Sequence, residues 1–450
     1  MEYAVLTGIV LVSGVLLALF AQWRDWRPSL TTAILVGVAV RVLLLITSAN
    51  DAWQPVDFME SFKPAGEAVL NRQDPVLGSE GGWHFLPTIP YVYGILLWLG
   101  IPWEYAGRLV TVVADIALIP LVAKLAGGPR AGLRAFQYAL NPLALLVACI
   151  HGQVEPVALA FGVAAFVVAR GPGDPERTGF TLPVLDRVRH YGASDVVHRV
   201  VAKVRRELKP GIDDRATLRR GILAGVLMGL ALCAKSWPIW LIPGMLLLLP
   251  NLRARIASLV LTGAVPLFFL VTLPIFAGTA LSEIPAVIKE IQNIRPIVGE
   301  WGWTPWFTEG SWALEPELAK FGTYLIYASV LVVIFLWRRA DPIDLTIAIL
   351  LVFMVVTPRL GAQYLLWFMP FLIARPTRFA WPAIIGVSLW AGYGYLYMTQ
   401  FDVDTWWWLH SLWSRASIVL LPLLVLAMPW ERRVPAAVRT ADSRPLIPSR

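Results

Sequence analysis

The chain has 450 residues, of which 57% are hydrophobic and only 15% charged, against about 45–50% and 25% in soluble globular proteins. A water-soluble fold of this length could not bury so much apolar surface. A secreted disulfide scaffold is also excluded, because Cys149 and Cys233 are the only cysteines and both lie in apolar runs. The composition therefore predicts a polytopic membrane protein.

A membrane-spanning helix needs roughly 20 apolar residues, and fewer when the bundle shields it. Suitable runs lie near 3–22, 30–48, 104–126, 132–149, 153–169, 220–236, 238–250, 255–276, 319–337, 342–356, 360–374, 380–397 and 411–428. They predict an all-α bundle of about 12–14 transmembrane helices, with residues 1–450 forming a single integral membrane domain. The short apolar segment 88–100 is interpreted as a half-helix or a juxtamembrane helix leading into the 104–126 span.

Basic residues occupy every second connection, including Arg24, Arg27, Arg130, Arg134, Arg253, Arg255, Arg338, Arg339, Arg375 and Arg378. Because cytoplasmic loops are enriched in Lys and Arg, these turns are predicted to be cytoplasmic. The N-terminus then lies outside, and the tail 430–450 lies in the cytoplasm. The basic segment 171–219 is interpreted as a cytoplasmic loop on anionic headgroups rather than as a nucleic-acid site, because no reader motif accompanies its charges. The net charge of +8 thus reflects topology, and the expected surroundings are membrane lipids, with no nucleic acid.

Three outer stretches remain, near 49–87, 277–318 and 398–410, and each combines tryptophans with carboxylates. Indole faces can stack on a sugar ring while carboxylates accept its hydroxyls. An aromatic belt at headgroup level is the alternative for any single Trp. The WGWTPW cluster containing Trp301 and Trp303, and the loop residue His84, are candidates for sugar or acceptor contact.

Within the first outer stretch, residues 56–71 predict a short amphipathic surface helix beginning near Asp57. Asp is a common helix N-cap, so this position has a purely structural explanation. The functional alternative is a general base held at the lipid–water boundary.

A second polar group, His151, Gln153 and Glu155, lies between two apolar runs. These side chains could bind acceptor hydroxyls, or Glu155 could simply favour the start of the next helix. With Asp57, Glu155 could also chelate a divalent cation, but no recognised metal-ligand spacing supports a metal.

Charged residues within or near membrane-spanning apolar runs are energetically costly and usually have a functional or structural role. Arg41 and Asp115 could pair with each other, whereas Lys235 and Arg359 lie near outer helix ends, at the depth of a lipid phosphate. Snorkelling to the headgroups is the alternative for Lys235 and Arg359.

Four segments in order, 41–76, 141–161, 219–243 and 357–370, carry the strings VDFMESF, NPLALLVACIHGQVEP, AGVLMGLALCAKSWP and TPRLGAQYLLWFMP. Together they resemble the GT-C membrane glycosyltransferases, and most closely the polyprenol-phosphate-sugar-dependent mannosyltransferases of actinobacterial envelopes and the GPI mannosyltransferase group. Two features depart from the family pattern: Glu155 stands where Asp is commoner, and the 171–219 insert is long.

The resemblance implies an inverting transfer of a sugar, with mannose favoured, from a polyprenyl-phosphate donor to a hydroxyl of a glycolipid or glycan acceptor on the extracytoplasmic face of the plasma membrane. It gives Asp57 the role of general base. Donor-phosphate binding is expected of Lys235, Arg359 and Arg41, and acceptor or sugar binding of Glu155, His151, Gln153, His84, Trp301, Trp303, Gln363 and Tyr364. No cofactor is expected. A transporter or flippase of a lipid-linked sugar is the alternative, although no internal repeat typical of transporters is evident; a structural membrane subunit is a further one.

Overall fold

The computed structural model describes residues 2–79, 82–171, 214–292, 301–308, 316–338 and 340–430, and every regular element in these ranges is a helix. Within these ranges, seven helices are long and apolar enough to cross a membrane. They are α1 (Glu2–Trp23), α2 (Leu30–Ala49), α5 (Trp103–Ala126), α10 (Asp214–Ala234), α12 (Leu252–Val271) running on into α13 (Leu273–Phe276), α15 (Pro316–Leu336), and α19 (Val403–Ala416) running on into α20 (Leu420–Leu426). The predicted all-α membrane architecture is confirmed.

The other predicted spans are shorter or broken helices. α6 (Ala131–Ala139) is followed by α7 (Pro142–Leu145) and the π-helical segment η3 (Leu146–His151), with a bend of 47° between the two halves. Pro142 opens the second half, and the Asn141 side chain caps it by accepting from the Ala144 N–H. The remaining elements are α8 (Glu155–Arg170), η5 (Trp237–Leu241) with α11 (Ile242–Leu248), α16 (Pro342–Val356), η8 (Ala362–Leu366) with α17 (Met369–Ala374), and α18 (Ala380–Gly392) with the π-helical η9 (Tyr393–Tyr397). The prediction of about 12–14 spans thus counted several segments that are too short to cross a bilayer alone.

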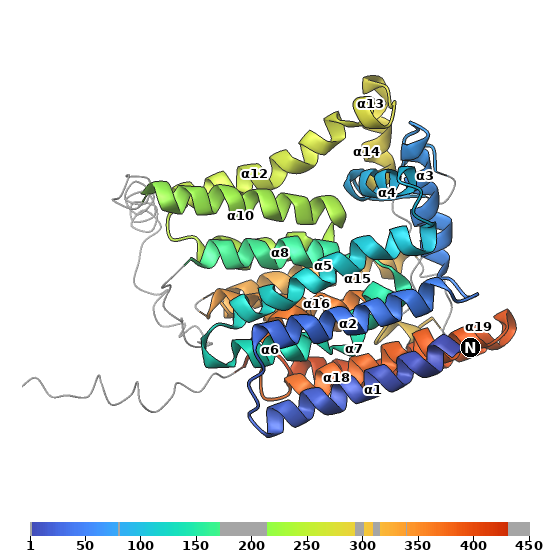
Figure 1. The fold of residues 1–450 in the computed structure, drawn as a ribbon. Coiled ribbons are helices and arrows are strands. Elements are labelled where there is room, and N and C mark those ends of the chain that lie inside the picture. The colour runs from blue at the N-terminus through green and yellow to red at the C-terminus, as the bar shows by residue number, and fades with distance from the viewer. Residues whose placement is uncertain are drawn as a thin grey trace, which may run out of the picture.

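The helices run side by side, so their connections gather at two opposite ends of the bundle (Figure 1). The turns after α1, α5 and α11, and the turn between α17 and α18, lie at one end, and these are the basic turns of the sequence. Arg130 links two of them through Asp25, at an Nε–Oδ1 distance of 3.3 Å. The N-terminus, α3 (Lys63–Leu70), α4 (Thr88–Trp98) and α14 (Ile284–Gln292) lie at the other end, which we call the outer end.

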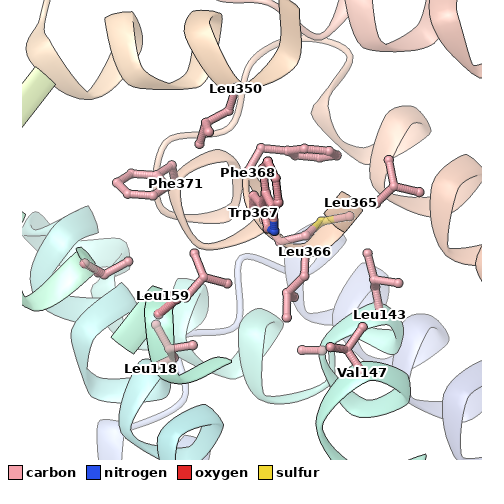
Figure 2. Close-up of a cluster of buried hydrophobic side chains, with 14 of the residues drawn as sticks. Leu118, Leu143, Val147, Leu159, Leu350, Leu365, Leu366, Trp367, Phe368 and Phe371 are labelled. Atoms are coloured by element: carbon pink, nitrogen blue, oxygen red, sulfur yellow. The ribbon is translucent and has the colours of Figure 1, made fainter. Parts of the chain in front are cut away.

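A buried apolar cluster fills the middle of the bundle (Figure 2). Leu366 and Phe368 of the η8–α17 segment meet Leu118 of α5, Leu159 of α8 and Leu350 of α16 there, and all five are fully buried. This packing explains how η8 and α17 remain at membrane depth although they are short: protein, rather than lipid, surrounds them. It also anchors the neighbouring Gln363 and Tyr364 against α8.

Two segments for which the sequence makes a prediction, 88–100 and 398–410, lie at the outer end. Residues 88–98 form the separate short helix α4, as expected of a half-helix, and α4 packs on α3 so closely that a Cβ at Gly66 would lie 2.8 Å from Tyr93 Cβ. The outer stretch 398–410 includes the start of α19: Asp402 caps this helix by accepting from the Thr405 N–H, so the tryptophans that follow are helical. The basic loop 171–219, apart from residue 171 and the start of α10, and the tail 430–450, apart from Trp430, lie outside the described residues.

Candidate functional site

Asp57 lies at the outer end, just before the π-helical segment η1 (Phe58–Phe62) that leads into α3. Its carboxylate makes no capping hydrogen bond to this helix. Instead, Gln153 donates its side-chain amide to Asp57 Oδ2 at 2.8 Å, and 43% of the Asp57 side chain stays exposed. A cap role therefore does not account for the Asp57 side chain, whereas a carboxylate held from one side and open on the other suits a base.

The turn His151–Gly152–Gln153 brings two polar side chains to Asp57. It ends η3, and Gly152 adopts a left-handed conformation with φ +72°. A Cβ at Gly152 would lie 2.7 Å from the Phe58 ring, so the turn and the Asp57 segment are in close contact. His151 Nε2 lies 3.9 Å from Asp57 Oδ2 and 3.2 Å from the Gln153 amide nitrogen.

Arg108 fixes the end of η3, where carbonyl groups lose their helical partners. It is buried and donates to the carbonyls of Cys149 at 2.9 Å and of Ile150 at 3.0 Å. Ser48 donates to the Cys149 carbonyl as well, and Thr111 to that of Ala148. Arg108 was not among the predicted site residues, although an arginine inside the apolar run 104–126 itself indicates a structural or functional role.

Glu155 and Lys235 form a buried ion pair next to this turn. Lys235 Nζ lies 3.2 Å from Glu155 Oε1, and the two side chains are 7% and 0% exposed. Snorkelling is thereby excluded for Lys235, and a solvated turn is excluded for Glu155. The pair supplies a fixed cation at the outer end of α10, near the start of α8.

Aromatic rings surround this cation. Phe85 and Tyr364 place their ring centroids 4.2 Å and 5.9 Å from Lys235 Nζ, in the range of cation–π attraction. Trp367 lies beside Tyr364 and stacks on Trp237 at 4.4 Å between centroids. Tyr364 is therefore part of the site's wall.

Two other predicted residues, Gln363 and His84, lie around this wall and in the first outer loop. Gln363 is buried next to Tyr364. His84 belongs to the same loop as Phe85, where burial lowers the pKa of its imidazole and the charge of Glu290 on α14 opposes that shift.

Arg41, which we predicted to bind the donor phosphate, lies in a buried ion pair instead. Its guanidinium pairs with Asp115, with Nη2–Oδ2 2.7 Å and both side chains fully buried, and donates to the carbonyl of Ala139 at the break after α6. Tyr138 donates to the other oxygen of Asp115 at 2.6 Å. Arg41 and Asp115 thus pair with each other, as the sequence suggested. The Asp115 carboxylate therefore binds the guanidinium that we had expected to bind the donor phosphate.

The second outer stretch is described for residues 277–292, 301–308 and 316–318. Trp301 is fully buried, donates its indole N–H to the Met354 carbonyl at 2.6 Å and packs edge-on against Trp390. Trp303 donates to the Val356 carbonyl at 3.3 Å. Both indoles dock this segment on the end of α16, beside Arg359, and this packing does not favour the sugar-stacking role predicted for Trp301.

No group of three or more His, Cys, Asp or Glu side chains arranged to hold a metal occurs among the described residues. The arrangement that does occur is a half-exposed carboxylate, amide and imidazole partners holding it, and a buried cation in an aromatic wall. Such a set can take a proton from a hydroxyl and attract an anionic group.

No protein-family model matches the chain, and no curated protein matches it. Among solved structures it is similar to the oligosaccharyltransferase AglB of the archaeon Archaeoglobus fulgidus, in complex with an inhibitory peptide and a dolichol-phosphate: 13% identity, 93% of this chain and 58% of that chain covered, TM-score 0.42. The oligosaccharyltransferase from the same organism is also similar in its complex with Zn and sulfate (14%, 92% and 55%, 0.37) and in its apo form (12%, 93% and 58%, 0.39). The chain thus spans less than two thirds of the length of these structures, and the TM-scores are too low to assign it to a family.

Proposed function

We propose that this protein is an inverting membrane glycosyltransferase of the GT-C type. The observation that carries the proposal is the half-exposed Asp57 carboxylate, oriented by Gln153 beside the buried Glu155–Lys235 pair. The four ordered sequence resemblances support the same activity. The proposed donor is a polyprenyl-phosphate sugar, with mannose favoured, and the proposed acceptor is a hydroxyl of a cell-envelope glycolipid or glycan.

In the proposed reaction, the acceptor oxygen attacks the anomeric carbon of the donor sugar while Asp57 takes the hydroxyl proton. The bond between that carbon and the phosphate oxygen breaks on the opposite face, and its electron pair leaves with the phosphate. Lys235 and Arg359 stabilise the negative charge that develops on the leaving group. Direct displacement inverts the anomeric configuration.

The remaining site residues receive proposed roles according to where they lie. His151, Gln153 and Glu155 surround Asp57 and Lys235, so acceptor or sugar hydroxyls are their natural ligands, together with Gln363, Tyr364 and His84. Trp303, which docks on the end of α16, is proposed to contact the sugar on the basis of the sequence. We leave Arg41 out of the phosphate site because Asp115 occupies its guanidinium.

The distribution of basic residues supports a proposed side of the membrane for the site. The basic turns lie at the end of the bundle opposite α3, to which the Asp57 segment leads, and basic connections favour the cytoplasm. The proposed location is the plasma membrane, with the site on its extracytoplasmic side.

The purified protein, reconstituted in liposomes with a labelled polyprenyl-phosphate mannose and a panel of glycolipid acceptors, tests this function. We expect a glycosidic product with inverted anomeric configuration. Movement of the labelled donor between leaflets with no glycosidic product would contradict the proposal and favour a flippase. The same assay with other polyprenyl-phosphate sugars identifies the sugar.

A further inference from the structure

Three π-helical segments converge beside Asp57. η1 begins directly after Asp57, η3 ends at His151, and η9 contains Tyr395. Their side chains form one continuous series of short contacts: Tyr395 Oη to His151 Nδ1 at 2.7 Å, His151 Nε2 to the Gln153 amide nitrogen at 3.2 Å, and that nitrogen to Asp57 Oδ2 at 2.8 Å. π-Helical turns often occur at functional sites, because the extra residue redirects a side chain.

Hydrogen-bond chemistry fixes the direction of each contact. The Gln153 amide nitrogen carries only hydrogens, so it donates both to Asp57 and to His151 Nε2. The opposite amide orientation would place the Gln153 oxygen against the Asp57 carboxylate, two acceptors facing each other. His151 Nε2 must therefore accept, which leaves the imidazole proton on Nδ1, donated to Tyr395.

We propose that His151 and Tyr395 are positioning residues for the general base. Tyr395 holds His151 in the Nδ1–H tautomer, His151 then accepts from Gln153, and Gln153 keeps its second N–H on Asp57. This inference rests on the proposed function, since it concerns how the base of that reaction is oriented. His151 thus orients Gln153, in addition to any contact that it makes with the acceptor.

Burial makes this arrangement effective. Gln153 is 1% exposed and Tyr395 9% exposed, so neither can exchange its partner for water. The Asp57 side chain, in contrast, is 43% exposed and would otherwise sample several rotamers. The buried η9 and η3 segments therefore restrict the rotamers of the Asp57 carboxylate, which must remain accessible to an acceptor.

The tautomer of His151 gives a test that does not depend on activity. With ¹⁵N-labelled histidine in the detergent-solubilised protein, ¹⁵N chemical shifts distinguish Nδ1–H from Nε2–H, and the loss of one signal in His151→Gln assigns it among the five histidines. We expect the Nδ1–H tautomer at His151, and its loss in Tyr395→Phe. Tyr397→Phe is the matched control, because Tyr397 lies on the same η9 turn with its side chain exposed. An Nε2–H tautomer in the wild-type protein would overturn the proposal.

The kinetic test compares two substitutions of one residue. The Gln amide reaches the place of His151 Nε2 and keeps the contact to Gln153, whereas the Asn amide reaches the place of Nδ1 and keeps only the contact to Tyr395. We expect kcat to fall about tenfold in His151→Asn with KM for the donor unchanged, and less than about threefold in His151→Gln. Tyr395→Phe should lower kcat in the same way, and Tyr397→Phe should not.

Equal losses of kcat in His151→Asn and His151→Gln, or an unchanged kcat in Tyr395→Phe, would overturn the positioning role while leaving the transferase intact. An Nδ1–H tautomer in a protein that forms no glycosidic product would contradict the proposed function but confirm the hydrogen-bond series. The two failures are therefore distinguishable.

Discussion

Lys235 Nζ lies 3.2 Å from Glu155 Oε1, and the two side chains are almost completely buried at the outer end of the bundle. Removing one member leaves a buried charge without compensation, which costs about 3–5 kcal/mol in proteins. Each charge thus needs the other to remain inside the bundle. Lys235 can act on an anionic ligand only from within this pair.

We therefore expect Glu155→Gln and Lys235→Met each to lower the melting temperature strongly, and the double variant to recover most of the loss. Thermal unfolding of the detergent-solubilised protein measures this. The double variant should nevertheless lose most of its activity, because it lacks the Lys235 cation and retains only Arg359 for the leaving phosphate. Full activity in the stable double variant would contradict the role of Lys235.

A second prediction concerns Arg41, which pairs with Asp115 in the middle of the bundle. If this pair is structural, Arg41→Gln combined with Asp115→Asn leaves no uncompensated charge. We expect this double variant to fold and to keep the wild-type KM for the donor, whereas Arg41→Gln alone lowers the melting temperature. A large rise in donor KM in the stable double variant would show that Arg41 does bind the phosphate.

A third prediction concerns Gly152. Alanine there costs about 1–2 kcal/mol for the left-handed backbone, and its Cβ would lie 2.7 Å from the Phe58 ring. We expect Gly152→Ala to lower both stability and kcat, because the contact displaces the segment that carries Asp57. Gly263→Ala is the control: a Cβ there meets nothing within 4 Å, so kcat should stay unchanged. Equal kcat in both variants would contradict the coupling of Gly152 to Asp57.

The sequence predicted the helical segments well, because the apolar runs that must span a membrane are long and uninterrupted. It overestimated the number of full spans, since the segment 360–374 is largely apolar whether protein or lipid surrounds it. In the structure Leu366 and Phe368 are fully buried by protein, so two short helices suffice there. Hydropathy alone carries no information about that difference.

The site was predicted in part. The sequence identified Asp57, Gln153 and Glu155 as candidates because polar residues at helix ends interrupt the apolar runs. The pairing of Glu155 with Lys235 and the series leading to Tyr395 depend on contacts between residues far apart in the chain, which no local pattern encodes. Conversely, the tryptophan cluster at Trp301 was predicted to stack on a sugar. In the structure, the Trp301 indole N–H instead donates to a carbonyl of α16 and docks the loop there.

The central claim is that Asp57 is the general base of a sugar transfer, and Asp57→Asn tests it most directly. Asn keeps the size of the side chain but cannot take a proton, and general-base catalysis contributes about 100-fold or more. We measure turnover of a polyprenyl-phosphate mannose by the reconstituted protein, with Glu60→Gln as the control, since Glu60 is an exposed carboxylate three residues further along the same segment. The account predicts that Asp57→Asn lowers kcat by about 100-fold or more at unchanged melting temperature, while Glu60→Gln turns over like the wild type. Wild-type turnover in Asp57→Asn would contradict it.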